Sequence, residues 1–191
     1  ARLTAELARP SFYDEVTAKR LALERGWPMF ADPLRGHRRV VPSPRPRRIV
    51  PLPTIASLVE QGAVVVCCGG GGIPVTTDRA GTITGVEAVV DKDRVSALLA
   101  IELGARRLVI TTGVDAVYTG YHGDRPRRLA DVDLATVTRL SGEGEFPPGS
   151  MGPKMEAISS FVHTTGGEGL VCLPEEVTEA LAGTTGTRVR R

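Results

Sequence analysis

The stretch DRVSALLAIELGARRLVITT, residues 93–112, contains the pattern that decides the fold. Residues 93–103 have helical apolar spacing and end at Gly104, a common helix stop signal. The apolar, β-branched run at 107–112 follows after a short connection and predicts a strand. An earlier run, AVVVCC at 63–68, predicts a second strand. The order strand, helix, strand predicts a βαβ unit.

The same alternation continues along the rest of the chain. Further helices are expected at residues 13–25 and 55–61 and near Leu134, Met155 and Glu175. Another strand is expected at residues 170–173. Alternating strands and helices predict an α/β fold with a mostly parallel sheet covered by helices on both faces.

Four consecutive glycines, Gly69, Gly70, Gly71 and Gly72, directly follow the apolar run at 63–68. Without Cβ atoms, such a loop adopts positive φ and lets a phosphate or carboxylate lie against backbone N–H groups. The spacing fits neither a Walker A loop nor a dinucleotide fingerprint. The loop therefore indicates an anion site, with an ordinary turn as the alternative.

The segment PGSMGPK, residues 148–154, places Lys154 at the start of an expected helix. Pro153 suits the first helical turn, and Gly166 is a stop signal. The helix N-terminus and the lysine both favour a bound anion. The alternative is a capped surface helix with a solvated lysine.

The segment DKD, residues 91–93, opens the helix of the βαβ unit. Asp91 or Asp93 can cap that helix, with Lys92 paired at the surface. Together with Lys154, however, Lys92 and Asp93 supply what phosphoryl transfer requires, namely cations on the moving group and a carboxylate that orients them.

Several motifs in order along the chain resemble those of carbamate kinase, a branch of the amino-acid-kinase superfamily. They are RGHRRVVPSPRP at 35–46, GGGGIP at 69–74, GVEAVVDKD at 85–93, VDAVY at 114–118, PGSMGPK at 148–154 and GT at 186–187. Their order and spacing cover nearly the whole chain, which makes the resemblance specific.

The resemblance implies reversible phosphoryl transfer between ATP and carbamate, giving ADP and carbamoyl phosphate, with Mg²⁺ on the nucleotide. It implies that Lys92 and Lys154 stabilise the transferring group and that Asp93 positions them. The glycine loop would bind phosphate or substrate. The nucleotide-binding residues it implies are Asp115, Tyr118, Met151, Gly152 and Pro153. It further implies a homodimer with a role in arginine metabolism.

The chain also departs from the family pattern. It lacks a starting methionine, and the N-terminal carbamate-binding lobe of the family is expected to be largely absent. The remaining parts are expected to be a small protruding, lid-like subdomain at 1–50 and a nucleotide-binding α/β lobe at 51–191. The Arg9-Pro10 pair replaces the family's Lys-Pro, and Gly113 stands where the family has a carboxylate.

Two functions follow from these observations. The first is a carbamate kinase whose activity is impaired in this chain; the alternative is a non-catalytic nucleotide-binding remnant or dimerisation partner. The retained Lys92, Asp93 and Lys154 favour the enzyme, and the missing lobe favours the remnant. A third option is an amino-acid kinase with another acceptor, against which the segment at 35–46 argues.

Composition excludes several other classes. The net charge is +2, and only 4% of residues are aromatic, so the arginine clusters at 45–48, 125–128 and 188–191 are interpreted as solvated surface and not as nucleic-acid sites. The three cysteines lie in apolar runs and are expected to be reduced core residues, and the histidines show no metal-ligand spacing. With no membrane-length apolar run, no membrane partner is expected and the cytoplasm is the expected location.

Overall fold

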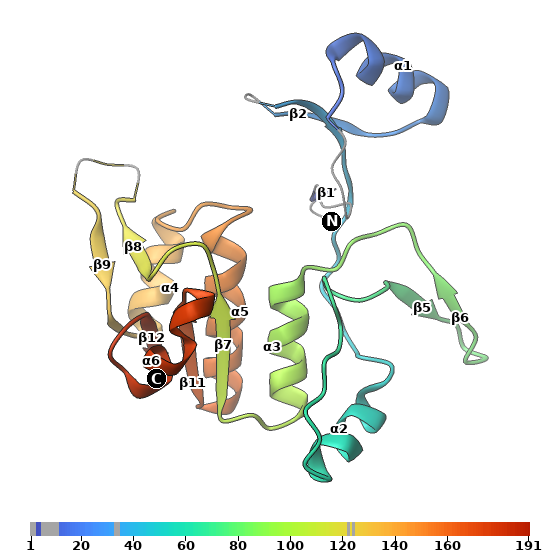
Figure 1. Ribbon diagram of the computed structural model, residues 1–191. Helices are drawn as coiled ribbons and strands as arrows, with labels where there is room; N and C mark the ends of the chain where they lie inside the picture. Colours follow the sequence, from blue (N-terminus) through green and yellow to red (C-terminus); the bar gives the residue numbers. More distant parts are fainter. Residues whose placement is uncertain (1–2, 5–11, 33–34, 122, 124) are drawn as a thin grey trace. The chain divides into compact units, whose positions relative to one another are not determined.

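The computed structural model describes residues 3–4, 12–32, 35–121, 123 and 125–191 (Figure 1). The chain divides into two compact units. The first unit comprises Ala1–Arg45 and Gly69–Asp91, and the second comprises Pro46–Cys68 and Lys92–Arg191. The domain boundary that the sequence places near residue 50 stays a prediction. In the structure, residues 69–91 belong to the same compact unit as residues 1–45.

The second unit is built on a four-stranded sheet. Its strands, in spatial order, are β10 (Asp131–Asp133), β12 (Thr187–Arg190), β11 (Glu168–Cys172) and β7 (Arg107–Thr111). The β10–β12 and β11–β7 pairs are parallel, and the β11–β12 pair is antiparallel. The sheet is therefore mostly parallel, as the alternating pattern predicted.

In the described part of the same unit there are five helices and one 3-10 turn. They are α2 (Leu52–Glu60), α3 (Lys92–Glu102), α4 (Leu134–Gly142), α5 (Met151–Thr165), η1 (Pro174–Glu176) and α6 (Val177–Ala182). Helix α5 supplies the centre of the core, because Met155, Ile158, Phe161 and Val162 are fully buried at helical spacing. Helices α3 and α5 pack side by side (Figure 1).

Helices cover both faces of this sheet. Val171 of β11 belongs to the core cluster that contains the buried residues of α5. The next residue, Cys172, points to the opposite face because side chains alternate along a strand. There the Cβ atoms of Cys172 and of Ala180 in α6 both lie close to Gly186. The expected two-sided cover is thus present, with α5 on one face and α6 on the other.

The strand expected at residues 63–68 is wrong for this structure. These residues follow α2 without helix or strand structure, and no strand in the described part of the chain pairs with them. Val64 and Val66 are 96% and 97% exposed. A strand needs a neighbour to accept its backbone hydrogen bonds, and the described residues provide none for this run. The βαβ prediction therefore holds only for α3 and β7.

The cysteines share this mixed outcome. All three are free. Cys172 is buried in β11, as expected for a core residue. Cys67 and Cys68 are only half-buried, because the run that carries them is not inside a sheet.

Among its described residues, the first unit contains one helix and short antiparallel strand pairs. These elements are β1 (Leu3–Thr4), α1 (Glu15–Arg25), β2 (Met29–Asp32), β3 (Gly36–Arg39), β4 (Val41–Pro42), β5 (Val75–Thr77) and β6 (Ile83–Gly85). Strand β1 pairs with β4, β2 with β3, and β5 with β6. Asp14 caps α1 by accepting the Thr17 backbone N–H at 2.8 Å. That hydrogen bond lowers the pKa of the Asp14 carboxyl.

Arg39 in the first unit makes structural contacts. Its guanidinium lies 4.4 Å from the centre of the Trp27 ring, and Arg25 lies 4.9 Å from the same ring. Arg39 also forms an ion pair with Glu87. These contacts tie β3 to the segment after β6. The Arg9-Pro10 departure lies outside the described residues. None of the described helices has both the length and the apolar character needed to cross a membrane.

Candidate active site

Lys154 and Asp93 form an ion pair between α5 and α3. The Lys154 Nζ atom donates to Asp93 Oδ2 at 3.1 Å and to Oδ1 at 3.4 Å. The two side chains are only 12% and 8% exposed. Asp93 lies in the first turn of α3, where it faces α5 and binds the lysine. Of the two roles weighed for Asp93, the structure thus favours lysine positioning over capping.

A second ion pair links the same two helices. Arg94 Nη2 lies 2.8 Å from Glu156 Oε2, with the two side chains 21% and 35% exposed. Asp93 and Arg94 are consecutive on α3, and Lys154 and Glu156 are two residues apart on α5. The Lys154–Asp93 pair holds the Lys154 ammonium against α3, and the Arg94–Glu156 pair adds a more exposed contact between the same helices.

The start of α5 is built by a tight turn. The Gly152 N–H donates to the Pro147 carbonyl at 3.0 Å. A Cβ at Gly152 would lie 3.0 Å from that same oxygen, so the close approach favours glycine. Ser150 occupies the N-cap position but makes no side-chain capping hydrogen bond. The first turn, Met151 to Lys154, therefore combines a helix N-terminus without a side-chain cap with a nearby lysine.

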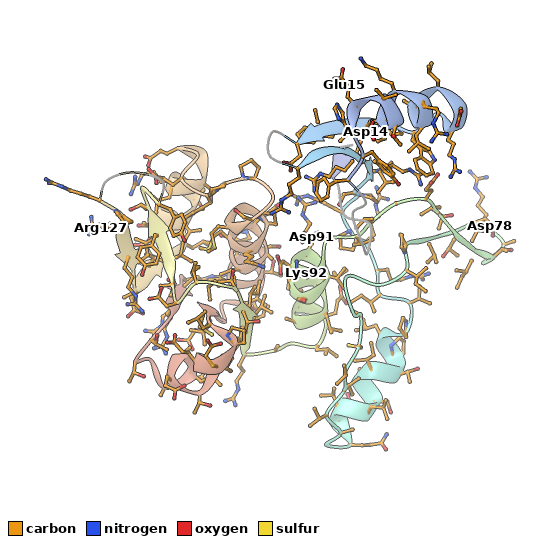
Figure 2. All side chains as sticks on the ribbon, turned by 45° about the horizontal axis from the view of Figure 1, so that its top comes forward. Asp14, Glu15, Asp78, Asp91, Lys92 and Arg127 are labelled. Atoms are coloured by element: carbon orange, nitrogen blue, oxygen red, sulfur yellow. The ribbon has the colours of Figure 1, made fainter. Side chains whose placement is uncertain are left out.

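Lys92 is the first residue of α3, and its side chain is exposed. Figure 2 shows Asp91 and Lys92 where the chain enters this helix. Asp93, the residue after Lys92, carries the contact with Lys154. The structure thus puts all three expected catalytic residues on the N-terminal turns of two packed helices. Their part in catalysis stays a prediction.

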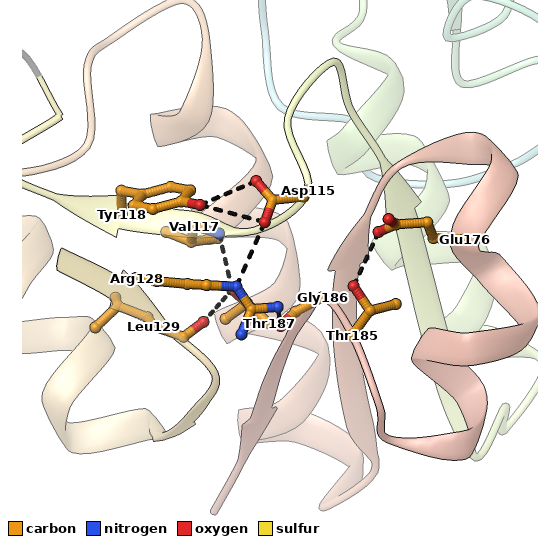
Figure 3. A network of polar contacts seen from close by, with 9 residues as sticks. All are labelled: Asp115, Val117, Tyr118, Arg128, Leu129, Glu176, Thr185, Gly186 and Thr187. Atoms are coloured by element: carbon orange, nitrogen blue, oxygen red, sulfur yellow. Dashed lines mark hydrogen bonds and ion pairs between the residues drawn. The ribbon is translucent and has the colours of Figure 1, made fainter. Parts of the chain in front are cut away.

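Asp115 and Tyr118 also come together (Figure 3). The Tyr118 hydroxyl donates to Asp115 Oδ1 at 3.0 Å, and this bond raises the pKa of the Tyr118 phenol. Arg128 completes the group, with its Nε atom 3.4 Å from Asp115 Oδ2 and its Nη2 atom donating to the Gly186 carbonyl at 3.1 Å. Tyr118 lies in β8 (Val117–Thr119), and Arg128 in the paired strand β9 (Arg127–Leu129).

Thr187 anchors this hairpin to the sheet. Its hydroxyl accepts the Val117 N–H at 2.8 Å and donates to the Leu129 carbonyl at 2.5 Å, and the residue is fully buried (Figure 3). One side chain at the start of β12 thus satisfies a backbone group in each strand of the hairpin. The hairpin that carries Tyr118 and Arg128 is held in place through this hydroxyl.

Replacing Thr187 by valine is expected to destabilise the second unit by about 1–3 kcal/mol, because two buried backbone groups lose their partner while the volume is kept. Urea unfolding measures the change. Thr187→Ser is the matched control, since it keeps the hydroxyl, and it is expected to retain more of the stability than valine. Equal stability of the valine variant and the native chain would contradict this assignment.

The four glycines of the expected anion loop belong to the first unit. Gly69, Gly71 and Gly72 have φ values of 47°, 122° and 85°. These left-handed conformations are the ones that glycine alone adopts without strain. The backbone is therefore that of a glycine-dependent turn, and its expected role in anion binding stays a prediction.

Sequence reasoning missed the contacts of two arginines, one in the site and one in the sheet. Arg128 was assigned to a solvated basic cluster, but it pairs with Asp115. Arg188, from another such cluster, lies 3.2 Å from Glu168. The alternation of arginine with buried Leu129 and Val189 was a signal that these residues lie in strands, where one face contacts the protein.

Comparison with known proteins shows the family. A model described as the amino acid kinase family matches residues 11–172. The chain belongs to the amino acid kinase family. This membership agrees with the α/β fold and with the order of the motifs along the chain.

Within the amino acid kinase family, the chain is similar to proteins named as carbamate kinases or carbamate kinase-like. It is 48% identical over 163 residues to the carbamate kinase-like protein YahI of Escherichia coli, covering 85% of this chain and 52% of that protein. It is 44% identical over 178 residues to a carbamate kinase of Pyrococcus furiosus, covering 93% of this chain and 56% of that enzyme. The chain thus spans about half the length of these curated relatives.

A solved carbamate kinase structure is also similar to this chain. Carbamate kinase from Giardia lamblia bound to AMP-PNP superposes with a TM-score of 0.85 at 38% identity, covering 94% of this chain and 57% of that one. The likeness confirms the expected amino-acid-kinase-like fold for the part that is present.

Proposed function

We propose that this chain carries the nucleotide half of a carbamate kinase site, which transfers a phosphoryl group reversibly between ATP and carbamate to give ADP and carbamoyl phosphate. The observation that carries this proposal is the Lys154–Asp93 pair beside the N-terminus of α5, which has no side-chain cap. The similarity to carbamate kinases supports the choice of acceptor.

The chemistry follows from charge. In a loose phosphoryl transition state, negative charge spreads over the oxygens of the moving group, and catalysis consists mainly of alignment and neutralisation. Lys154 and Lys92 supply the positive charge. Asp93 Oδ2 accepts from Lys154 Nζ at 3.1 Å and so holds the ammonium in position. The lysine therefore does not have to reorganise during the reaction. The N–H groups at the start of α5 add a partial positive charge.

Binding of the two substrates is assigned to different residues. Met151, Gly152 and Pro153 lie at the helix end that would face the nucleotide phosphates, and Asp115 and Tyr118 offer polar groups to the nucleoside. The Gly69 to Gly72 loop is proposed to bind phosphate or substrate through its backbone N–H groups.

Mg²⁺ is proposed to arrive on the nucleotide. In phosphotransferases this ion is commonly held by phosphate oxygens, with only one or two carboxylates from the protein. Asp93 is engaged by Lys154, and Asp115 by Tyr118 and Arg128, so the phosphate oxygens are proposed to hold the ion. When bound, the ion neutralises charge on the phosphate groups, and the lysines act beside it.

The alternative is a non-catalytic nucleotide-binding remnant or dimerisation partner. The chain spans only about half of its curated relatives. For this reason we propose that the chain alone is impaired as an enzyme. We further propose that the protein is a homodimer, that it is located in the cytoplasm and that it has a role in arginine metabolism. Light scattering tests the dimer. A folded protein that is purely monomeric would contradict it.

Nucleotide binding tests the part of the function common to both candidates. The chain is expected to bind ADP, detectable by calorimetry and by thermal shift. Ligand at a hundredfold excess over its dissociation constant stabilises a native state by about 2.7 kcal/mol, so specific binding is visible in unfolding. Absence of heat and of any shift at millimolar ADP, with the chain folded, would contradict the proposal.

A further inference from the structure

The Glu145 carboxylate connects two segments of the second unit that are distant in sequence. Its Oε2 atom accepts the backbone N–H of Gly120 at 2.7 Å. Gly120 directly follows β8, and Glu145 lies in the connection from α4 to α5. A hydrogen bond from a backbone N–H to a carboxylate is charge-assisted and therefore stronger than one between neutral groups. The carboxylate thus ties the end of β8 to the chain that leads into α5.

The backbone around Glu145 is anchored on both sides. The Glu145 N–H donates to the Leu140 carbonyl at 3.1 Å, at the end of α4. The next residue, Phe146, is buried in the core cluster that also contains the buried residues of α5. Because a backbone hydrogen bond and a buried ring hold this short stretch, the carboxylate gives Gly120 a fixed point of attachment.

The chain after this buried ring turns directly into α5. The Pro147 carbonyl accepts the N–H groups of Ser150 at 3.3 Å and of Gly152 at 3.0 Å. Gly152 belongs to the first turn of α5, which also carries Lys154. This is the turn proposed to receive the nucleotide phosphates. On this side, Glu145 is therefore connected to the phosphate part of the proposed site.

The other end of the hydrogen bond lies between two aromatic residues. Tyr118 precedes Gly120 by two positions and Tyr121 follows it, and the centroids of the two rings are 6.0 Å apart. The Tyr118 hydroxyl donates to the Asp115 carboxylate (Figure 3). Asp115 and Tyr118 are the residues proposed to contact the nucleoside. On this side, the hydrogen bond therefore reaches the nucleoside part of the proposed site.

We propose that Glu145 is a positioning residue that sets the spacing between the nucleoside part and the phosphate part of the nucleotide site. The inference rests on the proposed function, because ADP has to occupy both parts at once. A ligand that contacts two elements binds more tightly when both are already in place, since less ordering has to occur on binding. Glu145 acts through the Gly120 N–H and through the turn at Pro147, without contact to the nucleotide.

Calorimetry of ADP binding to the 191-residue chain tests this role. Glu145→Ala is expected to weaken ADP binding by about 10-fold, the scale of one hydrogen bond to a charged group. In the same variant, the Gly120 amide is expected to exchange its hydrogen faster than in the native chain, because it has lost its acceptor. Circular dichroism checks that both chains are folded at the temperature of the measurement.

Two variants serve as controls. Glu145→Gln keeps a side-chain oxygen that accepts the Gly120 N–H, so it is expected to retain most of the ADP affinity. Glu143→Ala removes a carboxylate two positions earlier, which pairs with Arg139 on α4. This variant is expected to bind ADP as the native chain does.

The outcomes separate this inference from the proposed function. Equal ADP affinity of the Glu145→Ala variant and the native chain would overturn the inference alone. A lower unfolding midpoint with unchanged ADP affinity would also overturn it, since Glu145 would then serve only stability. Loss of affinity in the Glu145→Gln variant as large as in Glu145→Ala would exclude the hydrogen bond to Gly120 as the cause. Absence of ADP binding to the native chain would overturn the proposed function and this inference with it.

Discussion

Replacing Lys154 by alanine is expected to lower the rate of ATP formation by about 10²–10³-fold, the scale for removal of one preorganised charge-stabilising donor. The measurement uses the complemented protein, meaning this chain together with the unmatched portion of the Pyrococcus furiosus enzyme. The loss is expected mainly in kcat, with ADP binding less affected, because the lysine acts on the transferring group.

Glu156, two residues after Lys154 on α5, provides a matched control. Glu156→Gln breaks the other ion pair between α3 and α5 but leaves Lys154 and Asp93 in place. A partly exposed pair contributes little, about 0–1 kcal/mol, so the control is expected to retain most of its turnover. Equal rates for the Lys154→Ala variant and the native protein would contradict the assigned chemistry.

The Lys154→Ala substitution is also expected to lower the stability of the folded protein. Lys154→Ala leaves the Asp93 carboxylate, 8% exposed, without its cation, and removing one partner of a buried pair costs about 3–5 kcal/mol. Asp93→Asn/Lys154→Met removes both charges and is expected to recover stability while turnover stays low. Recovery of turnover along with stability would assign the pair a purely structural role.

Much of the fold could be predicted from local sequence signals. Helix α3 and strand β7 are bounded by Gly104 and by a change from helical spacing to a β-branched run. Helix α5 ends at Gly166 in the left-handed conformation, as its stop signal predicted. These signals are local, so their effect does not depend on contacts with the rest of the chain.

Strand formation was harder to predict because it depends on a partner. The runs at 63–68 and 107–111 both have the apolar, β-branched composition of strands, but only the second has a neighbour, β11, to pair with among the described residues. Conversely, β12 pairs with both β10 and β11 although its sequence, TRVR, is half arginine. Pairing partners distant in sequence decided both outcomes.

The site was predicted in part for a similar reason. Lys154 and Asp93 were singled out by motif and are brought together across two helices. Arg128 and Thr187 act through contacts with Asp115 and with the backbone of Val117 and Leu129, which no spacing in the sequence reveals. Residues that position others were thus found only from the folded chain.

The most direct test of phosphoryl transfer is a coupled assay of ATP formation from ADP and carbamoyl phosphate. It compares the 191-residue chain alone with the complemented protein. Loss of substrate alignment forfeits about 7–11 kcal/mol of effective-concentration advantage, more than Lys92 and Lys154 offset by themselves. We expect Mg²⁺-dependent ATP formation by the complemented protein and little by the chain alone. A complex that binds ADP but forms no more ATP than its Lys154→Ala variant would contradict the account, as would robust turnover by the chain alone.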